Sequence, residues 1–194
     1  MAFFLSSSVV FADNAEEMAR ADDFYNKQEI SNASKAYTKL ALQNYLPAQV
    51  RLADLMYASG YLEVSTGWCI MAAFQGDVAG ANCLANAYIA GYGINKDPEQ
   101  ALYWYKIAAN GDVLNAVRVL AASYLLGSAS GLPLPVDLKQ AEYWKARDVI
   151  LTEENTKRSV EERAALQKKL DEKAAAIKEA DKEAASKSKQ GQAK

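Results

Sequence analysis

Residues 76–112 read GDVAGANCLANAYIAGYGINKDPEQALYWYKIAANGD, and much of this stretch recurs on both sides of it. Tryptophan returns at intervals of 36 and 40 residues, and tyrosine at intervals of 31 and 36. The residues in question are Trp68, Trp104 and Trp144, with Tyr57, Tyr88 and Tyr124. Periods of this length indicate helix pairs that stack side by side, so we predict that these six aromatic residues lie in the core of the repeats.

The quoted stretch also contains the signals of two helices and the turn between them. Leu84, Ala85 and Tyr88 follow the spacing of one helical face. Asp97 precedes Pro98, which is a favourable N-cap followed by a favourable first helical residue. Small residues at regular positions allow the helices to cross closely, and Trp104 fills the space between layers. The stretch therefore predicts one helix–turn–helix unit.

This unit resembles the Sel1-like repeat, a relative of the tetratricopeptide repeat. The matching positions are Gly80, Leu84, Ala85, Tyr88, Gly91, Gly93, Ile94, Asp97, Ala101, Trp104, Tyr105, Ala108, Ala109 and Gly111. The resemblance extends over roughly residues 16–150 and weakens toward the N-terminus. The family's glycine after the leucine is alanine here, at Ala53, Ala85 and Ala121. The resemblance implies an all-α, right-handed solenoid that serves as an adaptor for protein complexes and that bacteria often export.

Three further segments complete the predicted organisation. Residues 13–150 form about four helix pairs, and the Lys- and Glu-rich residues 151–183 form a long charged helix that begins at Thr152 or Asn155. That helix packs on the solenoid, reaches out from it as a solvated cap, or pairs with a partner helix. Residues 184–194 are rich in Lys, Ser, Gln and Ala, a composition typical of disorder.

The first twelve residues, MAFFLSSSVVFA, are apolar and end in a small residue before Asp13. This pattern predicts a cleaved signal peptide and a periplasmic or secreted protein, although the usual basic residues at the start are missing. The alternative is a frayed N-terminus or a first core helix. A run of about 10 apolar residues is too short to span a bilayer, and no other stretch approaches the required length of about 20.

The composition argues against several classes of function. The chain has no histidine among its 194 residues, which removes the commonest general base and zinc ligand. A net charge of −2 gives no basic field for nucleic acid. Adjacent carboxylates such as Glu16 and Glu17 stand at helix starts, where they complement the helix dipole. We therefore expect no cofactor and no metal site.

The two cysteines, Cys69 and Cys83, each lie seven residues from Gly76, where the chain turns between two helices. In an antiparallel helix pair they reach the same height, about 10 Å from the turn. Their equivalents in other repeats are apolar or aromatic, which indicates that they face inward. A disulfide is feasible if the Cα atoms lie within about 7 Å. The alternative is two buried, reduced thiols.

Candidate contacts for a partner come from loops and unconstrained aromatic residues. Tyr92 lies between two glycines at a loop tip. We expect it either to be an exposed anchor for a partner or to pack across the loop. Tyr61 is less constrained by the repeat. Leu132 and Leu134 lie in the proline-stiffened segment 128–135. We expect this segment either to form a surface that binds a partner or to fold back onto the solenoid.

We expect a non-catalytic adaptor of a bacterial envelope assembly that binds another protein through the first helices of its pairs. One alternative is a periplasmic regulator that sequesters a sensor or an envelope enzyme. Another is an exported hydrolase of the β-lactamase type, for which the chain shows no activated nucleophile. The predicted partner is a protein rather than nucleic acid, with no transmembrane segment in the chain.

Overall fold

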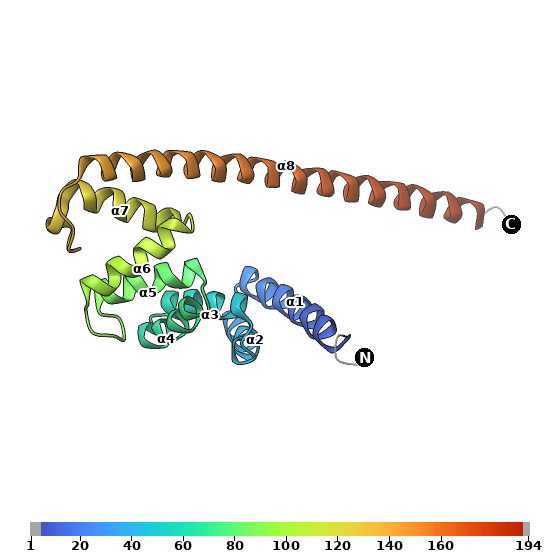
Figure 1. Cartoon of the computed structure of the whole chain (residues 1–194). Coiled ribbons are helices and arrows are strands. Elements are labelled where there is room, and N and C mark those ends of the chain that lie inside the picture. The colour runs from blue at the N-terminus through green and yellow to red at the C-terminus, as the bar shows by residue number, and fades with distance from the viewer. Residues whose placement is uncertain (1–4, 192–194) are drawn as a thin grey trace. The chain divides into compact units, whose positions relative to one another are not determined.

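The structure, a computed structural model, describes residues 5–191, and these form helices joined by short turns, with no strand among them (Figure 1). Six consecutive helices have 13 residues each: α2 (Ile30–Leu42), α3 (Leu46–Ala58), α4 (Leu62–Phe74), α5 (Val78–Ala90), α6 (Pro98–Asn110) and α7 (Leu114–Leu126). They are preceded by α1 (Leu5–Asn26) and followed by the short 3-10 helix η1 (Gly127–Ser130) and by α8 (Leu138–Gly191). The predicted all-α class is confirmed.

Each helix from α1 to α6 packs against the next one in the chain, which is the arrangement of a solenoid (Figure 1). The fourth pair forms in the same way, because Arg118 of α7 donates a 2.8 Å hydrogen bond to Asp148 near the start of α8. The helix pairs are therefore α1–α2, α3–α4, α5–α6 and α7 with the first turns of α8. The recurrence of tryptophan in the sequence follows this succession of pairs.

Aspartates begin three of these helices. Asp77 accepts a hydrogen bond from the Gly80 N–H, at 2.6 Å, and so caps α5. Asp97 accepts from the second and third N–H groups of α6, both at 3.1 Å, with Pro98 as the first helical residue, as the sequence predicts. Asp137 caps α8 in the same way. These caps satisfy N–H groups that have no partner inside a helix, and they fix where each helix starts.

Close helix crossings depend on small residues. A Cβ atom at Gly80 would lie 2.7 Å from the Ala72 Cβ and 2.8 Å from the Ala73 backbone nitrogen. Gly80 therefore lets α5 approach the backbone of α4. Gly111 also serves a close approach, because a Cβ there would lie 2.3 Å from Val78 Cγ1. The residue with a left-handed backbone conformation after α6 is Asp112, whose φ is 63°.

The core of the first two pairs is built on Tyr37, Leu40 and Leu52, none of which is more than 2% exposed. Trp68 packs against this core as a partly buried residue, as a repeat-core position should. Trp104 and Trp144 are 8% and 7% exposed, and the Trp104 ring meets the Phe74 ring edge-on at 5.4 Å. The large rings thus fill the space between successive pairs.

One predicted core residue is not in the core. Tyr57 is 53% exposed, so its assignment as a repeat-core tyrosine is wrong. Tyr88 and Tyr124 follow their repeat leucines by four residues and are partly buried, whereas Tyr57 follows Leu52 by five. Met56 occupies the equivalent position and packs against the core. The extra residue rotates Tyr57 out of the core by about 100°, one residue of a helix.

The C-terminal helix is longer than the sequence predicts. No glycine or proline occurs between Leu138 and Gly191, and α8 continues through residues 152–155, where we expected a helix to begin. It also includes residues 184–191, which we expected to be disordered, while 192–194 lie outside the described residues. The chain divides into two compact units after Asp148, close to the predicted boundary at 150. In the second unit, Val160 is 60% exposed and Lys168 pairs with Glu172 at 4.0 Å.

The N-terminal helix passes through the predicted cleavage point. α1 runs without a break from Leu5 across Ala12 to Asn26, and residues 1–4 of the predicted leader lie outside the described part of the chain. Within that part, no helix combines the length and the apolar character that a bilayer-spanning segment needs.

Candidate partner-binding groove

A groove with a volume of about 320 Å³ lies on the side of the solenoid where the first helices of successive pairs adjoin. Helices α3 and α5 supply most of its lining, and α4, the α5–α6 loop and the residue before α7 supply the rest. The lining residues are Asp54, Tyr57, Ser65, Thr66, Ala79, Asn82, Cys83, Asn86, Ala87, Tyr92 and Val113. Three repeats thus contribute to one hollow, which is the arrangement expected of a binding face in a solenoid.

Two hydroxyl groups hold the walls of this groove in place. Thr66 Oγ1 of α4 donates a 2.6 Å hydrogen bond to the Tyr92 carbonyl in the α5–α6 loop. Ser65 Oγ donates a 2.8 Å hydrogen bond to the Ala53 carbonyl of α3. Ser65 and Thr66 are both buried. Both hydroxyl groups already donate their hydrogen bonds to backbone carbonyls of neighbouring elements. They therefore hold the wall of the groove in place and do not donate to a ligand.

Asparagines Asn82 and Asn86 lie one turn apart on α5 and face the groove. Asn82 Oδ1 accepts a 2.9 Å hydrogen bond from Asn115 Nδ2, and Asn86 Oδ1 accepts a 2.6 Å hydrogen bond from the Tyr105 hydroxyl. Burial raises the pKa of Tyr105 to about 12, which keeps its hydroxyl protonated as a donor. Among the described residues, no hydrogen bond uses the Nδ2 groups of Asn82 and Asn86, so both amides remain available as donors.

An acidic and aromatic corner closes one part of the groove. Asp54 and Tyr57 lie one turn apart on α3, and the Tyr57 ring is 6.1 Å from the Tyr92 ring, tilted by 55°. Burial raises the pKa of Asp54, the Arg51 charge lowers it, and the Asp77 charge raises it further. Asp54 itself is exposed, so its carboxylate stays in contact with water, and Tyr57 and Tyr92 line the same part of the groove.

A disulfide lies behind the groove and joins two helix pairs. Cys69 of α4 is fully buried, Cys83 of α5 lines the groove, and their Cα atoms are 5.6 Å apart. The sequence left a bond or two reduced thiols as alternatives, and the structure contains the bond. Because α4 ends one pair and α5 begins the next, the link holds two repeats together.

Other residues that the sequence singled out lie in different surroundings. Tyr92 packs across its loop against Tyr57, which agrees with the second of the two roles considered for it. Tyr61 is 63% exposed in the loop between α3 and α4, and its role in binding stays a prediction. Leu132 and Leu134 are only 2% and 7% exposed. Their segment folds back onto the solenoid, so the prediction that they form a partner-binding surface is wrong.

Sequence reasoning missed the groove residues Asp54, Asn82 and Asn86. One signal for the asparagines was present, because two polar residues at a spacing of four interrupt the otherwise apolar helix α5. The repeat pattern draws attention to the core side of a helix, whereas these residues lie on its other side. No comparable signal marks Asp54, which acquires its setting only when α3, α5 and the α5–α6 loop come together.

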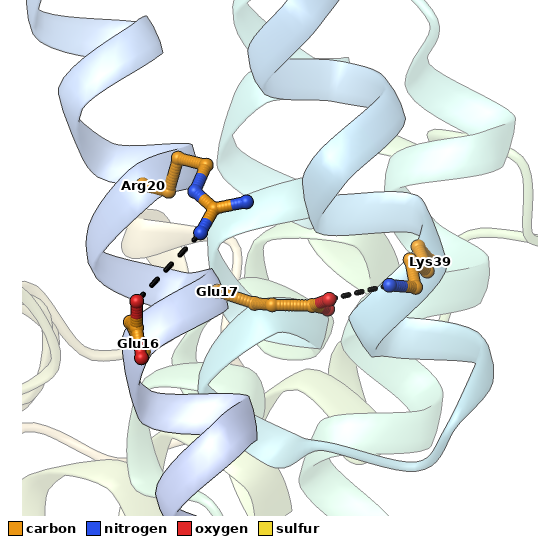
Figure 2. Close-up of polar contacts among 4 residues, drawn as sticks. All are labelled: Glu16, Glu17, Arg20 and Lys39. Atoms are coloured by element: carbon orange, nitrogen blue, oxygen red, sulfur yellow. Dashed lines mark hydrogen bonds and ion pairs between the residues drawn. The ribbon is translucent and has the colours of Figure 1, made fainter.

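A second hollow of about 470 Å³ lies between α1 and α2, with Phe24 and Ala36 among its lining residues. Figure 2 shows two ion pairs at this hollow: Glu17 pairs with Lys39 of α2 at 2.5 Å, and Glu16 pairs with Arg20 at 3.7 Å. Glu16 and Glu17, which we expected at a helix start, instead lie in the middle of α1 and are engaged in these ion pairs. This hollow belongs to a single helix pair, whereas the groove draws on three repeats, so the hollow is the weaker candidate for a partner that runs along the solenoid.

The described residues contain no group of three or more cysteine, aspartate or glutamate side chains arranged to hold a metal ion. The groove offers amide donors, a carboxylate and aromatic rings, and its one sulfur-bearing side chain is in a disulfide. These groups suit reversible contact with a polypeptide.

Comparison with known protein families gives a match to the Sel1 repeat at residues 80–113 and 120–144. These two stretches contain α5–α6 and most of the fourth pair, the part of the chain in which the repeat pattern is clearest. No curated protein sequence matches the chain significantly.

Two solved structures share the fold. A Sel1 repeat protein from Oxalobacter formigenes is 21% identical, with a TM-score of 0.53 over 60% of this chain and 88% of its own. The protective antigen c5321 of uropathogenic Escherichia coli, which displays an SLR fold, is 18% identical, with a TM-score of 0.63 over 75% of this chain. The match spans only 32% of the length of that antigen. At these identities the comparison shows the fold alone.

Proposed function

Because the chain carries Sel1 repeats, we propose that it is a non-catalytic adaptor that holds an extended segment of another protein in the groove along α3 and α5. Sel1 repeats generally mediate contacts between proteins, and they are generally scaffolds rather than enzymes. The groove lies on the first helices of successive pairs, which is where a stacked repeat array presents a continuous surface. Because stacked helix pairs give such a surface a fixed shape, we expect the bound segment of the partner to adapt its conformation to the groove.

The available amides of Asn82 and Asn86 carry this proposal. Four residues of an α-helix span about 6 Å, and two residues of an extended chain span about 6.6 Å. Two N–H donors at this separation can therefore reach successive carbonyl groups on the same edge of one extended segment. Tyr105 and Asn115 hold the carbonyl ends of the two side chains, which orients the amides in advance and lowers the entropy lost on binding.

A crosslinking experiment tests the groove directly. A photoreactive phenylalanine analogue replaces Ala79, an exposed residue that lines the groove, or Lys106, an exposed residue of α6 outside it. After irradiation in an extract of the producing cells, we expect one discrete crosslinked protein with the probe at position 79 and none with the probe at 106. Equal products at both positions, or none at either, would contradict the groove as the binding face.

We further propose that the protein works in the bacterial envelope. The apolar residues 1–12 support export, and the Cys69–Cys83 disulfide is of a kind that persists in oxidising compartments. Fractionation of the producing cells with N-terminal sequencing tests this location. We expect the protein in the periplasmic or secreted fraction with Asp13 as its first residue. A cytoplasmic protein that retains Met1 would rule the location out and leave the binding proposal untouched.

A further inference from the structure

We infer that the corner formed by Asp54, Tyr57 and Tyr92 receives the side chain of a lysine or arginine from the bound segment. This inference rests on the proposed function and adds the chemical class of the partner. Asp54 is the only charged side chain among the described residues that line the groove. It lies one turn before Tyr57 on α3, and the Tyr92 ring approaches from the α5–α6 loop.

The contacts within the protein leave this carboxylate available. Among the described residues, no hydrogen bond or ion pair reaches Asp54, and Arg51, whose charge acts on Asp54, pairs with Asp22 of α1 at 3.6 Å. Thr66 and Ser65, the hydroxyl donors beside it in the groove, donate to backbone carbonyls. Because Asp54 is exposed and its carboxylate has no partner within the described part of the protein, it can accept a charge-assisted hydrogen bond from an incoming cation.

The aromatic rings specify the kind of cation. A lysine ammonium or an arginine guanidinium gains about 0.5–2 kcal/mol over an aromatic face, and its hydrogen bond to a carboxylate is stronger than one between neutral groups. Tyr57 is 53% exposed, so its ring is accessible to a ligand. Asp77 adds a second negative charge near Asp54. An acidic segment would be repelled by the same two charges.

The amides of Asn82 and Asn86 make a peptide the source of this cation rather than a free amine. They bind the backbone of an extended segment in the same hollow as the acidic corner. A free amine or amino acid would meet the carboxylate but leave these two donors without carbonyl partners. The expected ligand is therefore an extended stretch of protein that carries a basic residue.

Immobilised octapeptide libraries with random flanking residues and a fixed central residue provide the test. The central residue is lysine, arginine, norleucine or glutamate, and the full-length protein with its disulfide intact is applied to each library. We expect at least fivefold more retention on the lysine and arginine libraries than on the norleucine library, and less on glutamate. The preference should decrease as the salt concentration rises, because salt screens charge pairs. Free lysine in excess of the peptide should not displace the protein.

Asp54→Asn, which keeps the shape and removes the charge, should abolish the preference for lysine and arginine over norleucine. Glu99→Gln removes the same charge on α6 outside the groove and should retain the full preference. Tyr57→Leu should lower the preference even if Asp54→Asn does not fold. Binding without a preference for basic residues, or a preference that survives Asp54→Asn, would overturn this inference and spare the proposed function. No retention on any library would overturn both.

Discussion

The Tyr105 hydroxyl of α6 donates a 2.6 Å hydrogen bond to Asn86 Oδ1 of α5, so a buried core residue orients a side chain on the binding face. Tyr105 is 4% exposed, whereas Asn86 lines the groove. One hydrogen bond thus couples the packing of the third helix pair to the geometry of the proposed site.

Replacing Tyr105 by phenylalanine removes this hydrogen bond and keeps the ring. We expect the free energy of unfolding to fall by about 1 kcal/mol, the usual net value of such a bond. Chemical denaturation followed by circular dichroism measures it. Tyr103→Phe on the same helix is the control, because Tyr103 is 56% exposed and should change the unfolding free energy by less than about 0.5 kcal/mol. Equal effects of the two substitutions would show that the hydrogen bond contributes nothing.

The disulfide should stabilise the junction between the second and third pairs. A loop of this size, with a sequence separation of 14 between the two cysteines, favours the folded state by about 3 kcal/mol through the entropy of the unfolded chain. We expect a reducing agent to lower the midpoint of urea unfolding of the natural protein. The Cys69→Ser/Cys83→Ser variant should start at the lower midpoint and not respond to the reductant. Identical midpoints for the natural protein with and without reductant would contradict the expected contribution.

The close crossing of α4 and α5 predicts opposite effects for two glycines. Gly80→Ala places a Cβ 2.8 Å from a backbone nitrogen of α4, and such overpacking costs about 1–3 kcal/mol. Gly67 lies inside α4 with no heavy atom within 4 Å of its would-be Cβ. Gly67→Ala should therefore raise the unfolding free energy by about 0.5–1 kcal/mol, because alanine is the better helix former. Thermal unfolding of both variants tests the pair, and a loss of stability in each would refute this account of the crossing.

The periodic sequence was sufficient to predict the helix pairs, because the repeat places the same residue types at the same height in each unit. Tyr88, Trp104 and Trp144 lie where the period puts them, since their positions depend on local spacing. Tyr57 does not, because one extra residue after Leu52 rotates it to the surface. The repeat period alone does not show on which side of α3 Tyr57 lies. The five-residue spacing from Leu52 shows it once the residues are placed around the helix.

The groove was harder to predict than the core, for a physical reason. Burial imposes an apolar pattern on one face of each helix, and that pattern can be read from a single sequence. The groove side mixes polar and apolar residues without a repeating pattern, so Asn82 and Asp54 resemble ordinary surface residues in the sequence. The prediction for Leu132 and Leu134 was wrong in the other direction, because it placed buried residues on a binding surface. Apolar residues in a loop indicate either a surface for a partner or a segment that folds back onto the protein. Only the packing in the structure distinguishes the two.

The raised pKa of Asp54 makes a prediction about stability that is independent of any ligand. Burial is the main cause of the increase, and the charge of Asp77 adds to it while that of Arg51 opposes it. An aspartate whose pKa is higher in the folded state than its unfolded value of about 3.9 binds its proton more tightly when folded. Protonated Asp54 therefore stabilises the folded state at pH values below its unfolded pKa. This stabilisation is lost as the pH rises through the pKa of the folded state.

Asp54→Asn removes this titration, so the variant should be slightly more stable than the natural protein at pH 7, by an amount that stays small because Asp54 is exposed and solvent screens its charge. The advantage should shrink as the pH falls and disappear near pH 3, where Asp54 is protonated in both states. Urea unfolding of the two proteins between pH 3 and pH 7 gives the difference directly, and Glu161→Gln in the exposed second unit serves as the control for loss of one negative charge. A variant that is less stable at pH 7 would mean that an attractive contact holds the carboxylate in the free protein. The expected gain would instead identify Asp54 as a residue that lowers stability, as is common where a site is built for binding.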